Sequence, residues 1–124
     1  MNKHKVSVIV LSFDTKEITH KCLEELSLAK KEAEKEKLGV EIVVLDNASS
    51  DDSAQMVREG YPWVKLIASK ENTGFAKGNN MAMEKAEGDY FLLLNSDAFV
   101  KKDTLVKHFG INYINFGICF NWGY

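Results

Sequence analysis

The sequence predicts an α/β fold in which a mostly parallel β-sheet carries helices on both faces. Apolar, strand-like runs alternate with longer segments of helical periodicity in the order β-α-β-α-β-α-β. The first two runs are apolar almost throughout, which is typical of strands buried on both faces. Helical segments of roughly 10–20 residues between strands favour parallel crossover connections. A chain of 124 residues is enough for one domain with one modest core.

Four apolar runs are expected to form the strands. Each is rich in aliphatic, β-branched or aromatic residues, and each ends in a polar or glycine-containing segment, as strands do. In chain order, the expected strands cover residues 6–12, 41–46, 64–68 and 90–94.

Three segments with helical periodicity lie between these strands. The first begins with Asp14 or Thr15 as its N-cap, and Gly39 is expected to end it. The second stops at Gly60-Tyr61-Pro62, and Gly88 closes the third. The expected helices cover residues 15–37, 51–59 and 75–87.

Charge, cysteine content and hydropathy disfavour several classes of protein. Sixteen Lys and Arg residues against eighteen Asp and Glu leave a net charge of −2, which disfavours a general nucleic-acid binder. Cys22 and Cys119 are too few for a disulfide scaffold and too far apart for a zinc motif. No apolar run approaches the roughly 20 residues of a transmembrane helix. We therefore expect a cytoplasmic protein, either free or peripheral to a membrane.

Polar clusters follow three of the expected strands. They are Ser12-Phe13-Asp14, Asp46-Asn47 and Asn95-Ser96-Asp97. Because the carboxyl ends of parallel strands share one edge of the sheet, Asp14, Asp46 and Asp97 are expected to face a common crevice. Carboxylates brought together need a cation or a ligand, so we interpret this edge as a binding site.

The phosphate-binding motifs of other α/β proteins are missing. No Gly-x-Gly-x-x-Gly follows the first strand, and there is no Walker A sequence. The glycine-bearing loop at 72–80 precedes the third helix, whose first N–H groups can receive a phosphate. Asn80 is expected on the inward face of this helix, either hydrogen-bonded within the core or donating to a ligand.

Together these segments resemble the family 2 glycosyltransferases, which have the Rossmann-like GT-A fold. The Asn-x-Gly-Phe-Ala and Asn-Ser-Asp forms are most similar to rhamnosyltransferases and related enzymes of cell-surface polysaccharide synthesis. The resemblance extends over residues 5–109 and is carried by residues 6–14, 43–51, 72–76 and 92–97.

The resemblance implies a site for a nucleotide-diphospho-sugar linked to UDP, GDP or dTDP. The turn Leu11-Ser12-Phe13 would pack around the base, and Asp46 would accept a hydrogen bond from it. The segment that carries Asn72, Gly74 and Asn80 would lie beside the ribose and the diphosphate.

The resemblance also implies a divalent metal, Mg²⁺ or Mn²⁺, on the diphosphate. Asn95-Ser96-Asp97 corresponds to the family's Asp-x-Asp element, with Asn95 in place of the first acidic residue. Asp97 and Asn95 are thus the expected metal ligands, and Ser96 is expected at the nucleotide. Such a cation stabilises the charge of the leaving diphosphate. The family's general base lies downstream of this element, so no residue here is assigned that role, and little transfer is expected from this chain alone.

The last residues differ in composition from the rest. Residues 1–109 are expected to form a nucleotide-sugar-binding half-domain, and residues 110–124 an atypical tail. The tail has no charged residue, and its aromatic side chains would leave an exposed apolar patch. We predict that it packs on the sheet or the helices, or pairs two chains into a homodimer. Its aromatic residues are Tyr113, Phe116, Phe120, Trp122 and Tyr124.

Other functions of the same fold class remain alternatives. The first is a nucleotide-binding or interaction module without transfer activity. A phosphoacceptor receiver domain with Asp46 as the acceptor is disfavoured, because it needs an acidic pair after the first strand, where only Asp14 occurs. A phosphatase with Asp-x-Asp after a strand is disfavoured by Asn95.

Overall fold

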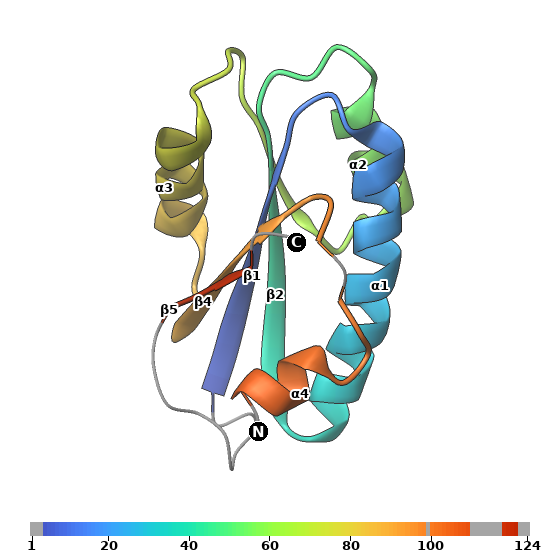
Figure 1. Ribbon diagram of the computed structural model, residues 1–124, viewed down its shortest axis with the longest axis vertical. Coiled ribbons are helices and arrows are strands. Elements are labelled where there is room, and N and C mark those ends of the chain that lie inside the picture. Colours follow the sequence, from blue (N-terminus) through green and yellow to red (C-terminus); the bar gives the residue numbers. More distant parts are fainter. Residues whose placement is uncertain (1–3, 99, 110–117, 122–124) are drawn as a thin grey trace.

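The chain folds into one parallel sheet between two layers of helices (Figure 1). The computed structural model describes residues 4–98, 100–109 and 118–121. The five strands lie in the order β3-β2-β1-β4-β5, and every neighbouring pair is parallel, which confirms the predicted fold class. The elements are β1 (His4–Ser12), α1 (Lys16–Lys35), β2 (Leu38–Asp46), α2 (Ser53–Gly60), β3 (Lys65–Ala68), α3 (Phe75–Lys85), β4 (Tyr90–Asn95), α4 (Thr104–Phe109) and β5 (Ile118–Asn121).

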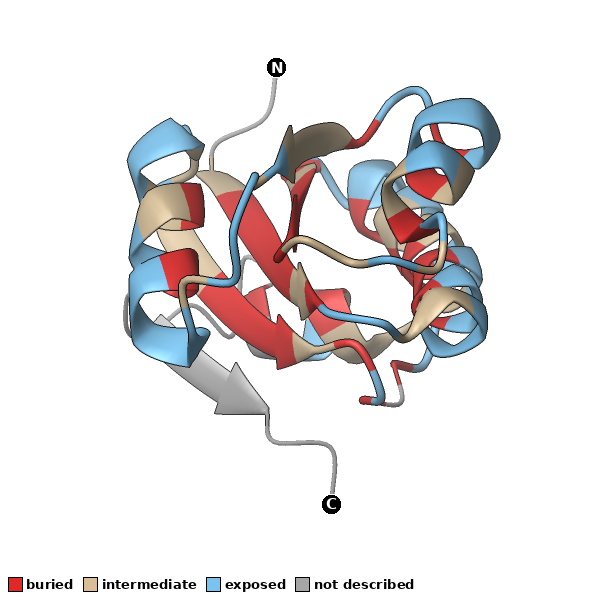
Figure 2. Cartoon of the chain, turned by 90° about the horizontal axis from the view of Figure 1, so that it is seen from above, coloured by how far each residue is buried: buried red, intermediate tan, exposed pale blue. Residues whose placement is uncertain are grey.

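Both faces of the sheet are covered, which explains the continuous apolar runs. Helices α1, α2 and α4 lie on one face and α3 on the other (Figure 1). Along β1, Val8 belongs to the larger core under α1, whereas Ile9 belongs to the smaller core under α3. Buried residues therefore line both sides of the central strands, and exposed ones lie on the outer faces of the helices (Figure 2).

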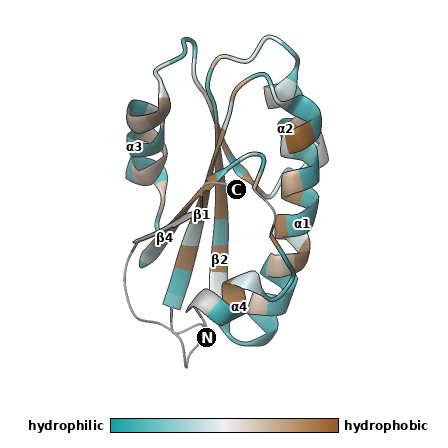
Figure 3. Ribbon diagram, viewed as in Figure 1, coloured by the Kyte–Doolittle hydropathy of each residue, from teal (hydrophilic) through white to brown (hydrophobic). Residues whose placement is uncertain are grey.

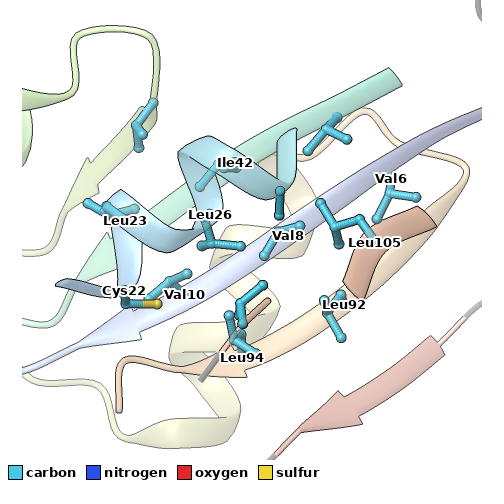
Figure 4. Packing of buried hydrophobic residues seen from close by; sticks show 14 of the residues in the cluster. Val6, Val8, Val10, Cys22, Leu23, Leu26, Ile42, Leu92, Leu94 and Leu105 are labelled. Carbon is cyan, nitrogen blue, oxygen red and sulfur yellow. The ribbon is translucent and has the colours of Figure 1, made fainter. Parts of the chain in front are cut away.

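The larger core fills the space between the sheet and α1. Leu23 and Leu26 of α1 are fully buried against the strands, and Leu105 of α4 closes the same cluster near the amino end of β1 (Figure 4). Hydrophobic and hydrophilic positions alternate along the ribbon of α1 (Figure 3), and its buried residues recur every three or four positions, as an amphipathic helix requires.

Two helix ends differ from the sequence prediction. Helix α1 ends at Lys35 rather than near Lys37, because Lys37 adopts a left-handed conformation with φ 66°. The N–H groups of Glu36 and Lys37 then bond to carbonyls of the last helical turn. As a result, Gly39 is not the helix terminator but a buried residue of β2. Helix α3 ends at Lys85, before the predicted residue 87.

Part of the predicted tail extends the sheet. Ile118–Asn121 form β5, which pairs with β4 at Phe91 to Leu94. This agrees with the prediction that the tail packs on the sheet. The remaining tail residues, and the pairing of two chains through them, lie outside the described residues. Among the described helices, none has the length and apolar character needed to cross a membrane.

Candidate functional site

The carboxyl ends of the strands carry a set of interlocked loops, which we call the rim: residues 12–15, 46–51, 69–75 and 95–98. Asp46, at the end of β2, is 3% exposed. Its Oδ1 accepts a hydrogen bond from the Ser49 hydroxyl (2.6 Å) and its Oδ2 accepts one from the Ser49 N–H (3.1 Å). A carboxylate has about four acceptor positions, so acceptor capacity remains on Asp46 after the loop is closed.

Asn47 joins β2 to the loop that precedes α3. Its side-chain Nδ2 donates to Asn72 Oδ1 (3.0 Å) and to the Gly74 carbonyl (3.3 Å). Its Oδ1 accepts from the N–H (2.8 Å) and the hydroxyl (3.2 Å) of Thr73. Asn47 is 2% exposed, so one buried amide side chain fixes the spacing between two loops of the rim.

Two aspartates join the loop after β1 to the loop after β2. Asp14 Oδ1 accepts from the Ser50 N–H (2.7 Å), and the Asp14 N–H donates to the Ser49 hydroxyl (2.8 Å). Asp51 Oδ2 accepts from the Lys16 N–H (3.0 Å) at the start of α1. Hydrogen bonds from Ser53, the larger contribution, and from Lys16 hold the pKa of Asp51 below its ordinary value. Thr15, one of the two predicted residues, occupies the N-cap position of α1, but it is the Asp51 carboxylate that accepts from the first turn.

Four hydroxyl groups connect β1, α1 and the turn after β4. The Ser12 and Thr19 hydroxyls share a hydrogen bond (2.8 Å), and both contact Thr15 Oγ1, at 3.4 and 3.0 Å. Thr15 Oγ1 also bonds to Ser96 Oγ (3.1 Å). Ser12 and Thr19 are fully buried and Ser96 is 9% exposed, so this cluster runs from the core to the edge of the rim.

The turn after β4 presents Asp97 to solvent. The Ala98 N–H donates to the Asn95 carbonyl (3.0 Å), which closes a turn with Ser96 and Asp97 at its centre. Ser96 is buried, Asn95 is half-buried and Asp97 is exposed. An exposed carboxylate on an ordered turn suits a hard cation that keeps several non-protein ligands.

The acidic residues of the rim do not gather into one cation site. In the described residues, no group of three or more His, Cys, Asp or Glu side chains is placed to hold a metal ion. The three carboxylates therefore do not form a shared cation site. The reason is that Asp14 and Asp46 are already paired with serine hydroxyls and backbone N–H groups. The expectation that this edge binds a ligand stays a prediction.

The start of α3 approaches the sheet closely. Gly74 has φ 82°, a conformation that side chains disfavour. At Gly78 an added Cβ would lie 2.9 Å from Leu11 Cδ1 and 3.0 Å from Leu45 Cδ2. This glycine therefore lets the helix pack directly on the ends of β1 and β2.

The inward asparagine of α3 is Asn79, not the predicted Asn80. Asn79 is 4% exposed and its buried Nδ2 has no hydrogen-bond partner among the described residues, whereas Asn80 is exposed. Consecutive helical residues point about 100° apart, so a shift of one residue moves a side chain from one face to another. The predicted role of Asn80 at a ligand stays a prediction for an exposed side chain.

A pocket lies beside Asp97, between α1 and the turn after β4. Burial, together with the negative charges of Glu25 and Asp97, raises the pKa of the Cys22 thiol to about 12. Cys22 therefore stays protonated near neutral pH and is no nucleophile. The pocket is lined by Ile18, Lys21, Cys22, Glu25, Ser96, Asp97 and Ala98.

Most sequence-predicted site residues lie on the rim or next to it. Ser12 is buried, Leu11 half-buried and Phe13 46% exposed at the end of β1. Asn72 Oδ1 accepts from the Gly74 N–H (2.8 Å) as well as from Asn47. The same rim contains three residues for which the sequence predicts no contact with a ligand or metal, namely Asn47, Asp51 and Thr15.

Known proteins with similar sequences are glycosyltransferases. A sequence model of glycosyl transferase family 2 matches residues 7–110. An uncharacterized glycosyltransferase of Bacillus subtilis, YfnE, is 36% identical over 106 residues, which is 84% of this chain and 26% of YfnE. The poly(ribitol-phosphate) beta-N-acetylglucosaminyltransferase TarS of Staphylococcus aureus is 34% identical over 104 residues, which is 82% of this chain and 18% of TarS. The chain thus spans about a quarter or less of these two relatives.

Solved structures with the same fold are also glycosyltransferases. The mannosyltransferase PcManGT of Pyrobaculum calidifontis, in complex with GDP-Man and Mn²⁺, superposes with a TM-score of 0.71 at 27% identity, over 85% of this chain and 31% of that one. Residues 1–349 of TarS, in complex with UDP-GlcNAc, superpose with a TM-score of 0.67 at 31% identity, over 82% of this chain and 29% of that one. The GT-A fold implied by the sequence motifs is thereby confirmed, and the chain belongs to glycosyl transferase family 2.

Proposed function

We propose that this chain forms the donor-binding part of a family 2 glycosyltransferase. It binds a nucleotide-diphospho-sugar at the rim, together with Mg²⁺ or Mn²⁺. The observation that carries this proposal is the buried Asn47 side chain, which ties the end of β2 to the Asn72–Gly74 segment. Two of the family's donor motifs are thus held in one rigid arrangement before any ligand arrives.

The base is proposed to bind at the ends of β1 and β2. Phe13 offers an exposed aromatic ring there, and flat aromatic rings stack well on bases. Asp46 is held rigid by Ser49 and retains acceptor capacity for an N–H of the base. Ligands of parallel α/β sheets bind beyond the carboxyl ends of the strands, which supports this placement.

The diphosphate and the metal are proposed to bind at Asp97. Because the described residues offer no cluster of three ligands, the protein alone is a poor chelator. A carboxylate together with phosphate oxygens is the usual way in which Mg²⁺ binds at nucleotides. The ion and the nucleotide should therefore bind together, and the ion, when bound, stabilises the negative charge of the departing diphosphate.

Sugar transfer is proposed for the complete catalytic unit to which this part belongs. The relatives include a poly(ribitol-phosphate) beta-N-acetylglucosaminyltransferase and a teichoic acid poly(glycerol phosphate) polymerase, which supports a role in cell-surface polysaccharide synthesis. Transfer of a hexosyl or rhamnosyl group stays a prediction, as does the choice among UDP, GDP and dTDP.

A calorimetric titration tests the proposal. UDP, GDP and dTDP are each titrated into the chain with and without Mn²⁺. We expect one nucleotide to bind with micromolar affinity. Mn²⁺ should strengthen that binding about tenfold or more. Absence of binding by all three nucleotides, in a protein whose fold is verified by circular dichroism, would contradict the proposal.

A further inference from the structure

Thr15 occupies the N-cap position of α1 but does not cap the helix. Thr and Ser at this position normally accept a hydrogen bond from an N–H of the first turn. The Thr15 side chain makes no such bond, and the carboxylate of Asp51 accepts from the Lys16 N–H instead. The Thr15 hydroxyl is therefore available for another purpose.

That hydroxyl is the centre of the four-hydroxyl cluster. Thr15 Oγ1 has three partners within the structure: Ser12, Thr19 and Ser96. A hydroxyl has one donor and two acceptor positions, so these three contacts use its full capacity. Of the four hydroxyls, Ser12 and Thr19 lie in the buried part. Among the described residues, the hydrogen bonds of the cluster link Ser96 to them through Thr15.

Ser96 in turn determines how Asp97 is presented. Ser96 and Asp97 are the two central residues of the turn closed between Asn95 and Ala98. Since Ser96 is held inward at 9% exposure and its neighbour is exposed, the direction of the Asp97 side chain depends on the anchorage of Ser96. A bond of 3.1 Å to Thr15 supplies that anchorage.

We propose that Thr15 is a positioning residue that sets the metal-binding turn relative to the loop after β1. It touches neither metal nor nucleotide in this role. It acts through Ser96. It thereby fixes the position of Asp97 relative to Phe13, which lies two residues before Thr15 in the loop after β1. The effect of Thr15 on metal binding rests on the function proposed above, whereas the anchorage of the turn does not.

Three variants separate positioning from simple packing. T15V removes the hydroxyl and keeps the shape of the side chain, and T15S keeps the hydroxyl. T19V makes the same change at a residue of the cluster whose hydroxyl bonds to Ser12 and Thr15, and is the matched control. Thermal unfolding identifies any general loss of stability.

The first measurement needs no ligand. Amide hydrogen exchange of Ala98, normalised to the amides of β1, reports opening of the turn. In T15V we expect exchange about fivefold faster, the effect of one lost hydrogen bond. In T15S and T19V the normalised rate should stay within about twofold of the parent. An unchanged rate in T15V, or an equal rise in T19V, would overturn the anchorage.

The second measurement concerns the metal. Mn²⁺ is expected to increase nucleotide affinity, and the measured quantity is the Mn²⁺ concentration that gives half of this increase. In T15V this concentration should rise about tenfold, as is found when residues that support a metal ligand are removed. Nucleotide affinity without metal should be unchanged, and T15S should restore the parent value. Equal loss of both affinities in T15V would overturn the role at the metal. If the parent binds no nucleotide, the proposed function and the metal role both fail, whereas the exchange experiment still decides the anchorage.

Discussion

The two ends of the sheet use polar side chains in opposite ways. At the amino ends of the strands, Ser7, Glu41, Lys65 and Glu87 form what we call the amino-end cluster. Glu41 Oε2 accepts from the Ser7 hydroxyl (2.6 Å) and the Glu87 N–H (2.8 Å), and its Oε1 pairs with Lys65 (2.9 Å). The three hydrogens of the Lys65 ammonium have three partners: Glu41, Glu87 and the Lys85 carbonyl.

The rim at the carboxyl ends is held mainly by amides, hydroxyls and aspartates that accept from serine. Asn47 and Thr15 join its loops, while Asp97, Phe13 and Phe75 remain exposed. The amino-end cluster thus closes the connection between α3 and β4 with paired charges. The loops of the rim hold one another in place and leave side chains that can bind a ligand accessible, which is the arrangement expected of a binding site.

Substitution of Gly88 should give the largest effect on stability. An added Cβ would lie 2.5 Å from Ser7 Oγ, 2.7 Å from Ser7 N and 3.0 Å from the Lys5 carbonyl. Because two of these atoms belong to the backbone, Gly88→Ala should lower the free energy of unfolding by about 2–3 kcal/mol. Urea unfolding measures this, with Gly60→Ala as control, since no atom lies within 4 Å of its added Cβ.

The two glycine variants also test the separation of the two ends. Nucleotide affinity of folded Gly88→Ala protein should stay within about twofold of the parent, because the rim is held by its own contacts. A large loss of affinity in this variant would show that the two ends are coupled.

Asp97→Asn should impair the metal-dependent nucleotide binding proposed for the rim and leave the stability of the fold unchanged. Removal of the carboxylate should abolish most of the gain in nucleotide affinity that the metal provides. Affinity in the presence of Mn²⁺ should therefore fall about tenfold or more. Affinity without metal should persist. Calorimetry with Mn²⁺ measures both, and Asp103→Asn, an exposed acid paired with Lys107 on α4, is the control. Equal metal dependence in Asp97→Asn and the parent would contradict the assignment of Asp97.

Glu41→Gln should give a smaller effect that depends on pH. Burial alone would raise the pKa of Glu41, but hydrogen bonds from Glu87 and Ser7 and the pairing with Lys65 hold it below its ordinary value. The ionised carboxylate then stabilises the fold at pH values above the pKa of the unfolded chain. This contribution is lost as the pH falls through the lower pKa of the folded state.

The variant should therefore be less stable than the parent by about 1–2 kcal/mol at pH 7. The difference should shrink as the pH falls through the acid range in which glutamate titrates. Denaturant unfolding as a function of pH checks this, with Glu32→Gln as control, because Glu32 is half-buried and pairs with the exposed Lys35 on the same helix. A difference that is constant with pH would rule out the charge of Glu41 as its cause.

The sequence predicts β1 to β4 and the three helices between them well, and their ends less well, whereas α4 and β5 are not among the predicted elements. Continuous apolar runs identify the central strands because both faces of the sheet are buried. The stripe of apolar residues identifies α1 because one face of this helix is buried. The left-handed conformation of Lys37 leaves no such trace within a charged run, so Gly39 was taken for the helix end. In α3, Asn79 and Asn80 are neighbours in the sequence. Only the packing of Gly78 against the sheet shows that Asn79 is the inward asparagine.

The rim shows what motifs can and cannot predict. Segments at the strand ends were expected at one edge, because parallel strands must bring them there. The partners of each side chain were not predictable, since Asp51 caps a helix 35 residues earlier in the chain and Thr15 reaches Ser96 across 81 residues. Such pairings depend on the register of β1 with β2 and β4, which sequence periodicity alone does not specify.

The central claim is that a nucleotide diphosphate binds at the rim and not at the amino-end cluster. The most direct test is a titration of isotope-labelled protein with UDP, GDP or dTDP and Mg²⁺, followed by backbone amide chemical shifts. We expect the largest shifts in residues 12–15, 46–50, 72–80 and 95–98, while the amides of Ser7, Glu41, Lys65 and Glu87 stay unchanged. Shifts concentrated in the amino-end cluster, or no shift with any of the three nucleotides, would contradict this claim.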